Sequence, residues 1–252
     1  MNVAIQNAAR RLEGARRVVA LTGAGLSTES GIPDFRSPGG VWERFRPIEY
    51  QDFLASHAAR KEHWRYKKAT VPVMLAAAPN AAHVALAQLE AAGRLQAVIT
   101  QNIDALHQRA GSRRVLELHG TNLETTCLQC AARAPIAEAL AQLDASADVP
   151  ACVHCGGWLK PATISFGQAL PADVLQEAAT LASESDCLLA LGSSLLVHPA
   201  ASLAGLAKQH GAALIVVNLT ATPYDQQADV VVHGTLGDVL PAIVAAAMSS
   251  CR

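Results

Sequence analysis

The sequence predicts an α/β fold in which a doubly wound parallel sheet carries a smaller lobe. Apolar runs of strand length recur along the chain, for example at 18–22 and 187–191, and helical patterns separate them. Two stretches break this rhythm: 38–77 holds most of the aromatic residues, and 121–160 holds four of the six cysteines. A length of 252 residues, with 51% of them hydrophobic, suits one large domain with insertions.

The N-terminal half supplies the first elements of this fold. The apolar spacing at 3–14 predicts an amphipathic helix, and 18–22 (Val-Val-Ala-Leu-Thr) predicts a buried strand. A glycine-rich turn at 23–31 follows the strand at once. The helical pattern at 81–92 stops at Gly93, a residue type that commonly ends helices.

The remaining elements complete the alternation and set the expected domain limits. Strands are predicted at 95–100, 187–191, 213–217 and 229–232, and helices near 135–144, 172–183 and 199–210. We expect one domain over 1–252. Its large part should span approximately 1–37, 78–120 and 161–252, and its small lobe approximately 38–77 (a helical insertion) and 121–160.

The charge balance argues against some classes of partner. The formal net charge is −1 and the charged fraction is 16%, so the chain carries no electrostatic footprint for nucleic acid or an anionic membrane. The N-terminus lacks a secretory pattern, and the longest apolar runs are only of strand length. The sequence therefore predicts a cytoplasmic protein without membrane or nucleic-acid binding, and it does not specify an oligomeric state.

The turn after the first strand has the context of a dinucleotide-binding loop. Gly23-Ala24-Gly25 would let backbone N–H groups approach a pyrophosphate closely. The next glycine lies farther on than in the usual G-x-G-x-x-G pattern, so a plain turn without a ligand is an alternative. Phe35 and Arg36 follow, and they could cover a ring face and meet phosphate or ribose oxygens.

Polar residues also follow the second strand, where ligands of open α/β sheets bind. Gln101, Asn102, Ile103 and Asp104 stand directly after 95–100. The alternative is an Asn/Asp turn that caps the next helix.

A histidine stands farther along, in Glu-Leu-His119-Gly120. A lone histidine is more often structural than catalytic. Its unperturbed pKa of about 6.5 nevertheless makes it a natural general base near neutral pH.

The cysteines form two pairs with metal-ligand spacing. Cys127-x2-Cys130 and Cys152-x2-Cys155 are separated by 21 residues. Two such knuckles predict tetrahedral coordination of one structural Zn²⁺, since four thiolates leave no open position. A redox pair is less consistent with the context, because neither pair sits in a thioredoxin-like βαβ unit. A nucleic-acid-binding zinc ribbon is another possibility, but no cluster of Lys or Arg surrounds these cysteines.

In this order, the motifs resemble those of the sirtuin family over roughly residues 12 to 245. The family pattern is Gly-Ala-Gly-x-Ser, Gly-Ile-Pro-x-Phe-Arg, Gln-Asn-Ile-Asp, His-Gly and two cysteine pairs, followed by a Phe-Gly loop. The resemblance implies a Rossmann-like sheet and an NAD-dependent protein-lysine deacylase that releases nicotinamide and O-acyl-ADP-ribose. An NAD glycohydrolase or mono-ADP-ribosyltransferase on the same fold is the alternative, and a non-catalytic zinc-stabilised binding module is another.

The resemblance also implies roles for individual residues. His119 would be the base acting on the NAD ribose hydroxyls, and Asn102 would order the reacting ribose region. Asp104 would hold the nicotinamide carboxamide, and Gln101 would contact a ribose hydroxyl. The remaining NAD contacts would come from Gly192, Ser193, Ser194, Asn218, Leu219 and Leu236.

The implied substrate is an acyl-lysine peptide that adds as a strand between two loops. Phe166, Gly167 and Val197 would contact it, and Gln168 stands where the family usually has Glu. Family members that remove acidic acyl groups carry a Tyr-x-x-Arg pair, which Tyr66-x-x-Ala69 does not match. The sequence therefore does not support an acidic acyl substrate, although Arg65, Lys67 or Lys68 could replace the missing arginine. An acetyl or longer neutral acyl group is the default.

Overall fold

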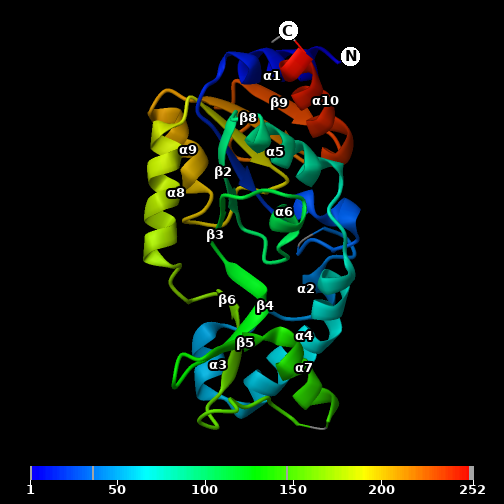
Figure 1. Cartoon of the computed structure of the whole chain (residues 1–252), viewed down its shortest axis with the longest axis vertical. Coiled ribbons are helices and arrows are strands. Elements are labelled where there is room, and N and C mark those ends of the chain that lie inside the picture. Colours follow the sequence, from blue (N-terminus) through cyan, green and yellow to red (C-terminus); the bar gives the residue numbers. More distant parts are fainter. Residues whose placement is uncertain (1, 36, 146, 250–252) are drawn as a thin grey trace.

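The structure is a computed structural model that describes residues 2–35, 37–145 and 147–249. Figure 1 shows an α/β body above a smaller lobe, joined by a few chain crossings. Helix α1 (Val3–Gly14) and helix α10 (Leu236–Ser249) pack together at the end of the body farthest from the lobe. The first and last described helices therefore lie on the same side of the sheet.

The body is built on a six-stranded sheet in the order β3-β2-β1-β7-β8-β9. Every neighbouring pair is parallel, which gives the strand order of a Rossmann-like fold. The strands are β1 (Val18–Thr22), β2 (Leu95–Thr100), β3 (Val115–Glu117), β7 (Cys187–Leu191), β8 (Ala213–Asn218) and β9 (Val230–His233).

Helices cover both faces of this sheet, and alternate residues of each strand point to opposite faces. Val18 and Ala20 of β1 pack into a core with α1, α10 and α5 (Ala81–Ala91). Val19 and Leu21 pack into a second core with α8 (Ala172–Glu184) and α9 (Ser202–Gln209). The unbroken apolar run of β1 is thus explained by burial on both faces, as expected for a doubly wound sheet.

The smaller lobe contains a three-stranded antiparallel sheet and the helical insertion. Trp64 is fully buried in a core with Cys127, Cys152 and Leu159, and its indole Nε1 donates to the Leu159 carbonyl at 3.2 Å. The two inserted segments therefore share one core. Their elements are α2 (Val41–Arg44), α3 (Tyr50–Ala55), α4 (His57–Ala76), β4 (Gly120–Cys127), β5 (Arg133–Pro135), α7 (Ile136–Asp144) and β6 (Leu159–Thr163).

The fold class predicted from the sequence is confirmed, with additions in detail. Strand β3 and the antiparallel order β5-β4-β6 were not predicted, and the glycine-rich turn folds into two short 3₁₀ helices, Ala24–Leu26 and Thr28–Ser30. A short helix, α6 (Leu106–Arg109), follows β2. These elements are too short, or too polar, to give a periodic signal of their own.

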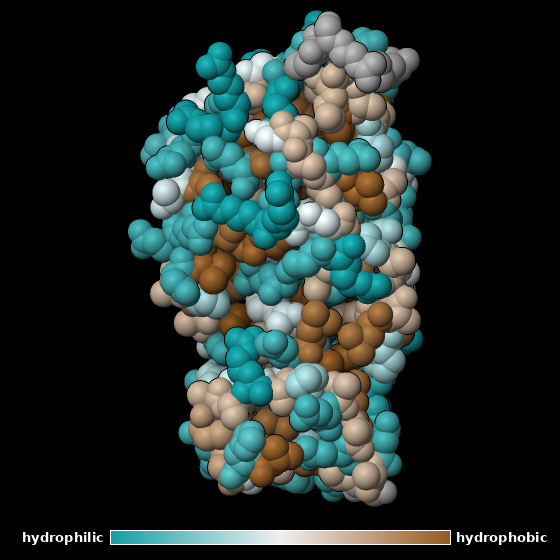
Figure 2. Space-filling model, viewed as in Figure 1, coloured by the Kyte–Doolittle hydropathy of each residue, from teal (hydrophilic) through white to brown (hydrophobic). Residues whose placement is uncertain are grey.

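Figure 2 shows a mainly hydrophilic face on which hydrophobic residues surface in separate patches. Within the described residues, no single helix has both the length and the apolar composition needed to cross a membrane. The bent pair α4 and α5 meets that criterion only when the two helices are counted together.

The strand order places a crevice at one edge of the sheet. Strands β1 and β7 are neighbours, and from them the chain winds outward in opposite directions. Connections on opposite faces leave a gap beyond the carboxyl ends of these two strands, where ligands of such sheets bind. Strands β1, β2 and β7 end at Thr22, Thr100 and Leu191. The segments that follow these strands border the gap, which faces the small lobe.

Candidate active site

A cavity of about 970 Å³ occupies this crevice and extends to the small lobe. Its volume lies in the upper part of the range expected for ligand sites. It brings together nearly all of the predicted contacts. Those that line it are Gly23, Ala24, Gly25, Phe35, Gln101, Asn102, Ile103, His119, Phe166, Gly167, Gly192, Ser193, Ser194, Val197, Asn218, Leu219 and Leu236.

Of the described residues in the prediction, Asp104 does not line the cavity wall. Arg36 lies outside the described residues. Asp104 is 5% exposed and stands behind the wall, where its Oδ2 accepts from Ser27 Oγ at 2.7 Å. Its other oxygen accepts from the backbone N–H of Leu106 at 2.9 Å, which supports the start of α6.

The glycine-rich turn is packed more tightly than a simple phosphate loop. The N–H of Gly23 donates to the Leu191 carbonyl at 3.0 Å, and that of Gly25 donates to the Gly192 carbonyl at 2.8 Å. A Cβ on Gly25 would lie 2.9 Å from the Gly192 oxygen. The N–H groups of Gly23 and Gly25 are therefore already paired within the protein. The glycines allow the turn to close against the loop after β7, and among the described hydrogen bonds the N–H of Ala24 is unused.

The polar segment after β2 is held by the same turn. Asn102 Nδ2 donates to the Gly23 carbonyl and to Ser27 Oγ, both at 3.1 Å, and Gln101 Nε2 donates to Ser193 Oγ at 3.0 Å. Burial raises the pKa of Asp104, while hydrogen bonds from Leu106 and Ser27 oppose that shift. The segments after β1, β2 and β7 thus form one hydrogen-bonded unit.

The His119 ring is held in one tautomer, which leaves one ring nitrogen with a free lone pair. Its Nδ1 lies 3.0 Å from the Gln101 carbonyl, which can only accept, so Nδ1 carries the proton and Nε2 keeps its lone pair. The carbonyl of His119 accepts from the Ile164 N–H at 2.9 Å, which fixes the backbone on the side of β6. Burial lowers the pKa of His119, and the hydrogen bond to Gln101 partly opposes this. The neutral ring is therefore the stable form near neutral pH.

The backbone turns sharply after His119, as the following glycine allows. Gly120 has φ of +69°, and a Cβ at this position would lie 2.0 Å from the Ala162 oxygen. Only glycine fits this approach of β4 to β6. The close pairing therefore presents His119 at the junction of body and lobe.

The predicted substrate loop is tied to the helical insertion. The carbonyl of Phe166 accepts from the Tyr50 N–H at 2.8 Å. Gln168 Oε1 accepts from the Ser165 N–H at 3.2 Å, so the amide that replaces the family's usual acid stabilises the loop from within. Phe166 itself is 46% exposed at the cavity rim, where a partner could cover it.

Several residues at or behind the cavity wall were not identified from the sequence. Ser27 belongs to the family motif, but its link between Asn102 and Asp104 became visible only in the structure. Trp42 lies between Phe35 and Phe166, with ring centroids 5.7 and 5.8 Å away. The aromatic richness of 38–77 was the signal that could have indicated this wall. The other additions that line the cavity on the small-lobe side are Phe45, His63, Tyr66 and Lys67.

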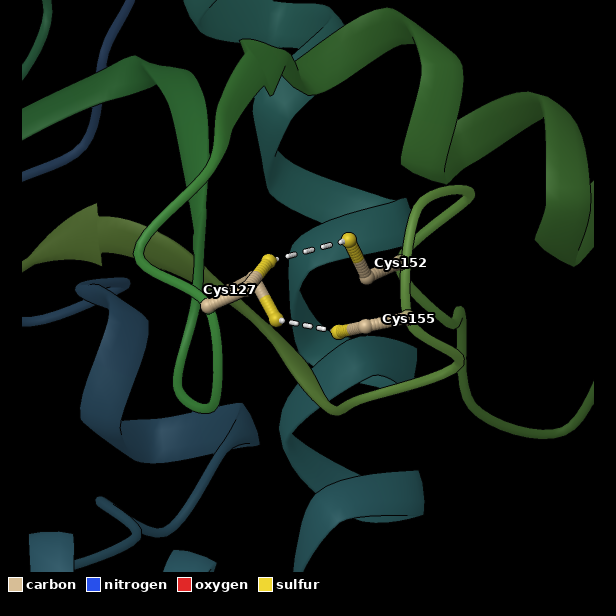
Figure 3. A group of neighbouring side chains, drawn as sticks. Cys127, Cys152 and Cys155 are labelled. Atoms are coloured by element: carbon tan, nitrogen blue, oxygen red, sulfur yellow. Dashed lines mark hydrogen bonds between the residues drawn. The ribbon is translucent and has the colours of Figure 1, made fainter.

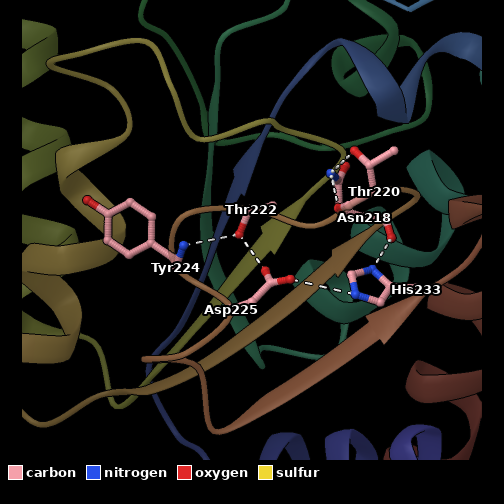
Figure 4. Close-up of polar contacts among 6 residues, drawn as sticks. All are labelled: Asn218, Thr220, Thr222, Tyr224, Asp225 and His233. Carbon is pink, nitrogen blue, oxygen red and sulfur yellow. Dashed lines mark hydrogen bonds and ion pairs between the residues drawn. The ribbon is translucent and has the colours of Figure 1, made fainter.

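The far end of the cavity is built around Asn218 at the end of β8. The side-chain Nδ2 of Asn218 donates to the backbone carbonyl of Thr220 at 2.8 Å (Figure 4). The backbone carbonyl of Asn218 accepts from His233 Nδ1 at 3.2 Å. The other side of the His233 ring faces Asp225, which accepts from the Thr222 hydroxyl. This network joins the ends of β8 and β9 and orders the loop between them.

The four paired cysteines converge in the small lobe. The Sγ atoms of Cys127 and Cys155 lie 3.5 Å apart, and those of Cys130 and Cys152 lie 3.7 Å apart. Figure 3 shows Cys127 facing Cys152 and Cys155 across the cluster. All four sulfurs lie within 4.8 Å of one another. A tetrahedral Zn²⁺ with bonds of about 2.3 Å places its sulfurs about 3.8 Å apart, so the cluster fits one zinc ion. Four thiolates complete the coordination, which makes the site structural.

A family model covers most of this architecture. Residues 23–199 match the Sir2 family. NAD-dependent protein deacetylase 2 of Streptomyces coelicolor is 45% identical over 239 residues, which cover 92% of this chain and 98% of that protein. The NAD-dependent protein deacetylase of Thermotoga maritima is 46% identical over 215 residues, or 85% of this chain and 86% of that one.

Solved structures agree with these similarities. A structure described as Sir2 with a p53 peptide and NAD⁺ has a TM-score of 0.88 at 39% identity, and the match covers 96% of this chain and 97% of that one. A second structure, from work on the mechanism and regulation of Sir2 enzymes, has a TM-score of 0.90 at 41% identity and covers 100% of both chains. The likeness therefore extends over both the body and the small lobe.

Proposed function

The chain belongs to the Sir2 family, and on that premise we propose that it is an NAD-dependent protein-lysine deacylase, with acetyl-lysine as its default substrate. One observation carries the proposal: a single cavity joins the segments after β1, β2 and β7 to His119 and to the Phe166 loop. A dinucleotide and an acyl-lysine can thus meet beside a neutral histidine.

The proposed reaction joins NAD⁺, an acyl-lysine and one water. The acyl oxygen attacks the anomeric carbon of the nicotinamide ribose, and the bond to nicotinamide breaks. The acyl group then passes to a ribose hydroxyl, and water releases the lysine amine, which takes up the remaining proton. The products are free lysine, nicotinamide and O-acyl-ADP-ribose.

The residues of this chain would divide the work by position. We assign His119 Nε2 to accept a proton from a ribose hydroxyl, because its Nδ1 is already committed to Gln101. Asn102 and Gln101, locked to Gly23 and Ser193, would order the nicotinamide ribose. Asp104 would act from behind them, as the acceptor that positions Ser27, rather than by lining the cavity.

The other contacts would lie on either side of this centre. Ala24 and the loop 192–194 would meet the pyrophosphate, and Asn218, Leu219 and Leu236 would hold the adenosine end. The peptide would extend along Phe166, Gly167 and Val197 as an added strand. The aromatic wall and the small lobe would exclude water from the reacting groups.

We also propose the domain limits and location predicted from the sequence. The large part would comprise approximately 1–37, 78–120 and 161–252, and the small lobe approximately 38–77 and 121–160. The shared core around Trp64 supports grouping the two insertions. A reducing compartment such as the cytoplasm is supported by the unpaired state of the five described cysteines.

Mass spectrometry of the products tests the proposed function. With NAD⁺ and an acetyl-lysine peptide, we expect equal amounts of deacetylated peptide and O-acetyl-ADP-ribose. Free ADP-ribose formed without the peptide would indicate a glycohydrolase instead. A peptide that gains the mass of ADP-ribose and keeps its acetyl group would indicate an ADP-ribosyltransferase.

A further inference from the structure

Two buried polar side chains lie at the small-lobe end of the cavity. His63 and Lys67 are four residues apart on α4, so they share one helix face. They are 7% and 3% exposed, and both line the cavity. The proposed NAD and peptide contacts do not include any residue of α4.

The ammonium of Lys67 has more donors than partners. It donates one hydrogen bond, to Asn122 Oδ1 at 2.7 Å, which leaves two N–H donors without an acceptor in the described part of the chain. None of the described carboxylates lies within ion-pair distance of it. The nearby Lys160 is also buried and adds positive charge. A buried cation without a counter-charge is costly, and an anionic ligand would compensate for it.

His63 adds a second unpaired group at the same place. Its Nε2 is buried without a hydrogen-bond partner among the described residues. Burial, together with the charges of Lys67 and Lys160, lowers the pKa of His63 well below its ordinary value. The neutral ring can donate through Nε2 to an acceptor that reaches Lys67.

The neighbouring cations do not share this position. Arg65 is 64% exposed and pairs with Glu62, and Lys68 is 50% exposed and pairs with Asp144. Of the three cations considered in the sequence, only Lys67 faces the cavity. The geometry of α4 explains why only one of the three side chains faces the cavity, because successive residues of an α-helix point about 100° apart.

Lys67 is connected through Asn122 to the segment that holds His119. Its acceptor, Asn122, is 1% exposed and donates its backbone N–H to the Ile103 carbonyl at 2.9 Å. Ile103 belongs to the segment that holds His119 through Gln101. An acyl chain that passes beyond His119 toward the small lobe therefore approaches α4.

We propose that Lys67, assisted by His63, binds the terminal carboxylate of an acidic acyl chain, so that the enzyme removes succinyl-type groups from lysine. This inference rests on the proposed deacylase function. The NAD pyrophosphate is assigned to the sheet side of the cavity and the peptide backbone to the Phe166 loop, which leaves the acyl group as the anion able to reach α4. Burial lowers the pKa of Lys67 to about 7, and a bound carboxylate would favour its charged form.

Paired acyl peptides test the inference. Succinyl-lysine and isohexanoyl-lysine have acyl groups of the same size and branching, but only the first is charged. We expect wild-type kcat/KM to favour the succinyl peptide by at least about tenfold, the size of a charge-assisted hydrogen bond. Lys67→Met should lower that ratio by about tenfold or more. Arg65→Met and Lys68→Met, at exposed positions, should leave it unchanged.

Other results would overturn the inference. A wild-type preference for isohexanoyl-lysine would do so. Equal losses with both peptides in Lys67→Met would also do so, because they would assign Lys67 a structural role. Turnover of acetyl-lysine in the same preparation separates this failure from failure of the deacylase function. If no acyl peptide turns over, fluorescence anisotropy of the two labelled peptides gives the same ratio from binding.

Discussion

At the scale of single residues, the tautomer of His119 decides what the site can do. Nδ1–H donates a hydrogen bond to the Gln101 carbonyl, so Nε2 is the basic atom. His119→Ala should lower peptide-dependent nicotinamide release by at least about a hundredfold, the lower range for a general base. Urea unfolding should change little, since the ring is held by one side-chain hydrogen bond. Near-normal release from a folded variant would exclude His119 as the base.

The same residue should set the acid limb of the pH profile. Burial lowers the pKa of His119, and a histidine acts as a base only when neutral. The rate should therefore hold as pH falls through about 6.5, the ordinary value, and decline only below it. The kcat/KM for an acetyl-lysine peptide, measured from pH 5 to 8, checks this. A midpoint above the ordinary value would contradict the burial argument.

Some residue roles could be predicted from the sequence, and others could not. The cysteine pairs stand in a motif whose chemistry depends on residue type and spacing, whereas the role of His119 was predicted from the family resemblance. The unused N–H of Ala24 depends on which strand lies beside β1, and that strand, β7, is distant in the sequence. Lys67 could not be chosen over Arg65 and Lys68, because only the packing of α4 sets which one faces inward.

At the scale of elements, the zinc cluster holds the lobe together. Cys127 and Cys152 belong to the core around Trp64, which joins α4 to the antiparallel sheet. Cys155→Ser should remove the bound zinc, lower the melting temperature and abolish activity, because metal binding contributes directly to folding. Metal analysis and calorimetry measure these effects. Cys187→Ala, within β7, is the control and should retain one zinc per chain.

The elements also differ in how well the sequence predicted them. Strands β1, β2 and β7 are continuous apolar runs because the sheet is covered on both faces, so their limits agree closely with the predicted ones. Strands β4 and β6 carry polar residues and are set by their pairing and by the contact at Gly120. Tertiary contacts of this kind leave no periodic signal.

At the scale of the whole molecule, buried histidines should make stability depend on pH. Burial lowers the pKa of His83 to about 4 and that of His107 to about 3, and it also lowers that of His63. Unfolding restores values of about 6.5, so the unfolded state binds more protons below that pH. The free energy of unfolding should therefore fall as pH decreases from 7 toward 4.

Urea titrations at several pH values measure this effect. The loss should begin near pH 6.5 and continue toward the folded-state values, since the neutral forms are the ones buried. His83→Phe should reduce the pH dependence, because it removes one of the titrating groups. A free energy that is constant, or that rises as pH decreases, would contradict the burial of neutral histidines.

We propose that the whole architecture serves to bring NAD and an acyl-lysine together beside His119. Nicotinamide release by the zinc-loaded protein tests this most directly, measured with NAD⁺ in the presence and absence of an acetyl-lysine peptide. We expect release that depends on the peptide and is lost in His119→Ala. Release that is equal without the peptide, or none with any acyl-lysine peptide, would contradict the deacylase assignment.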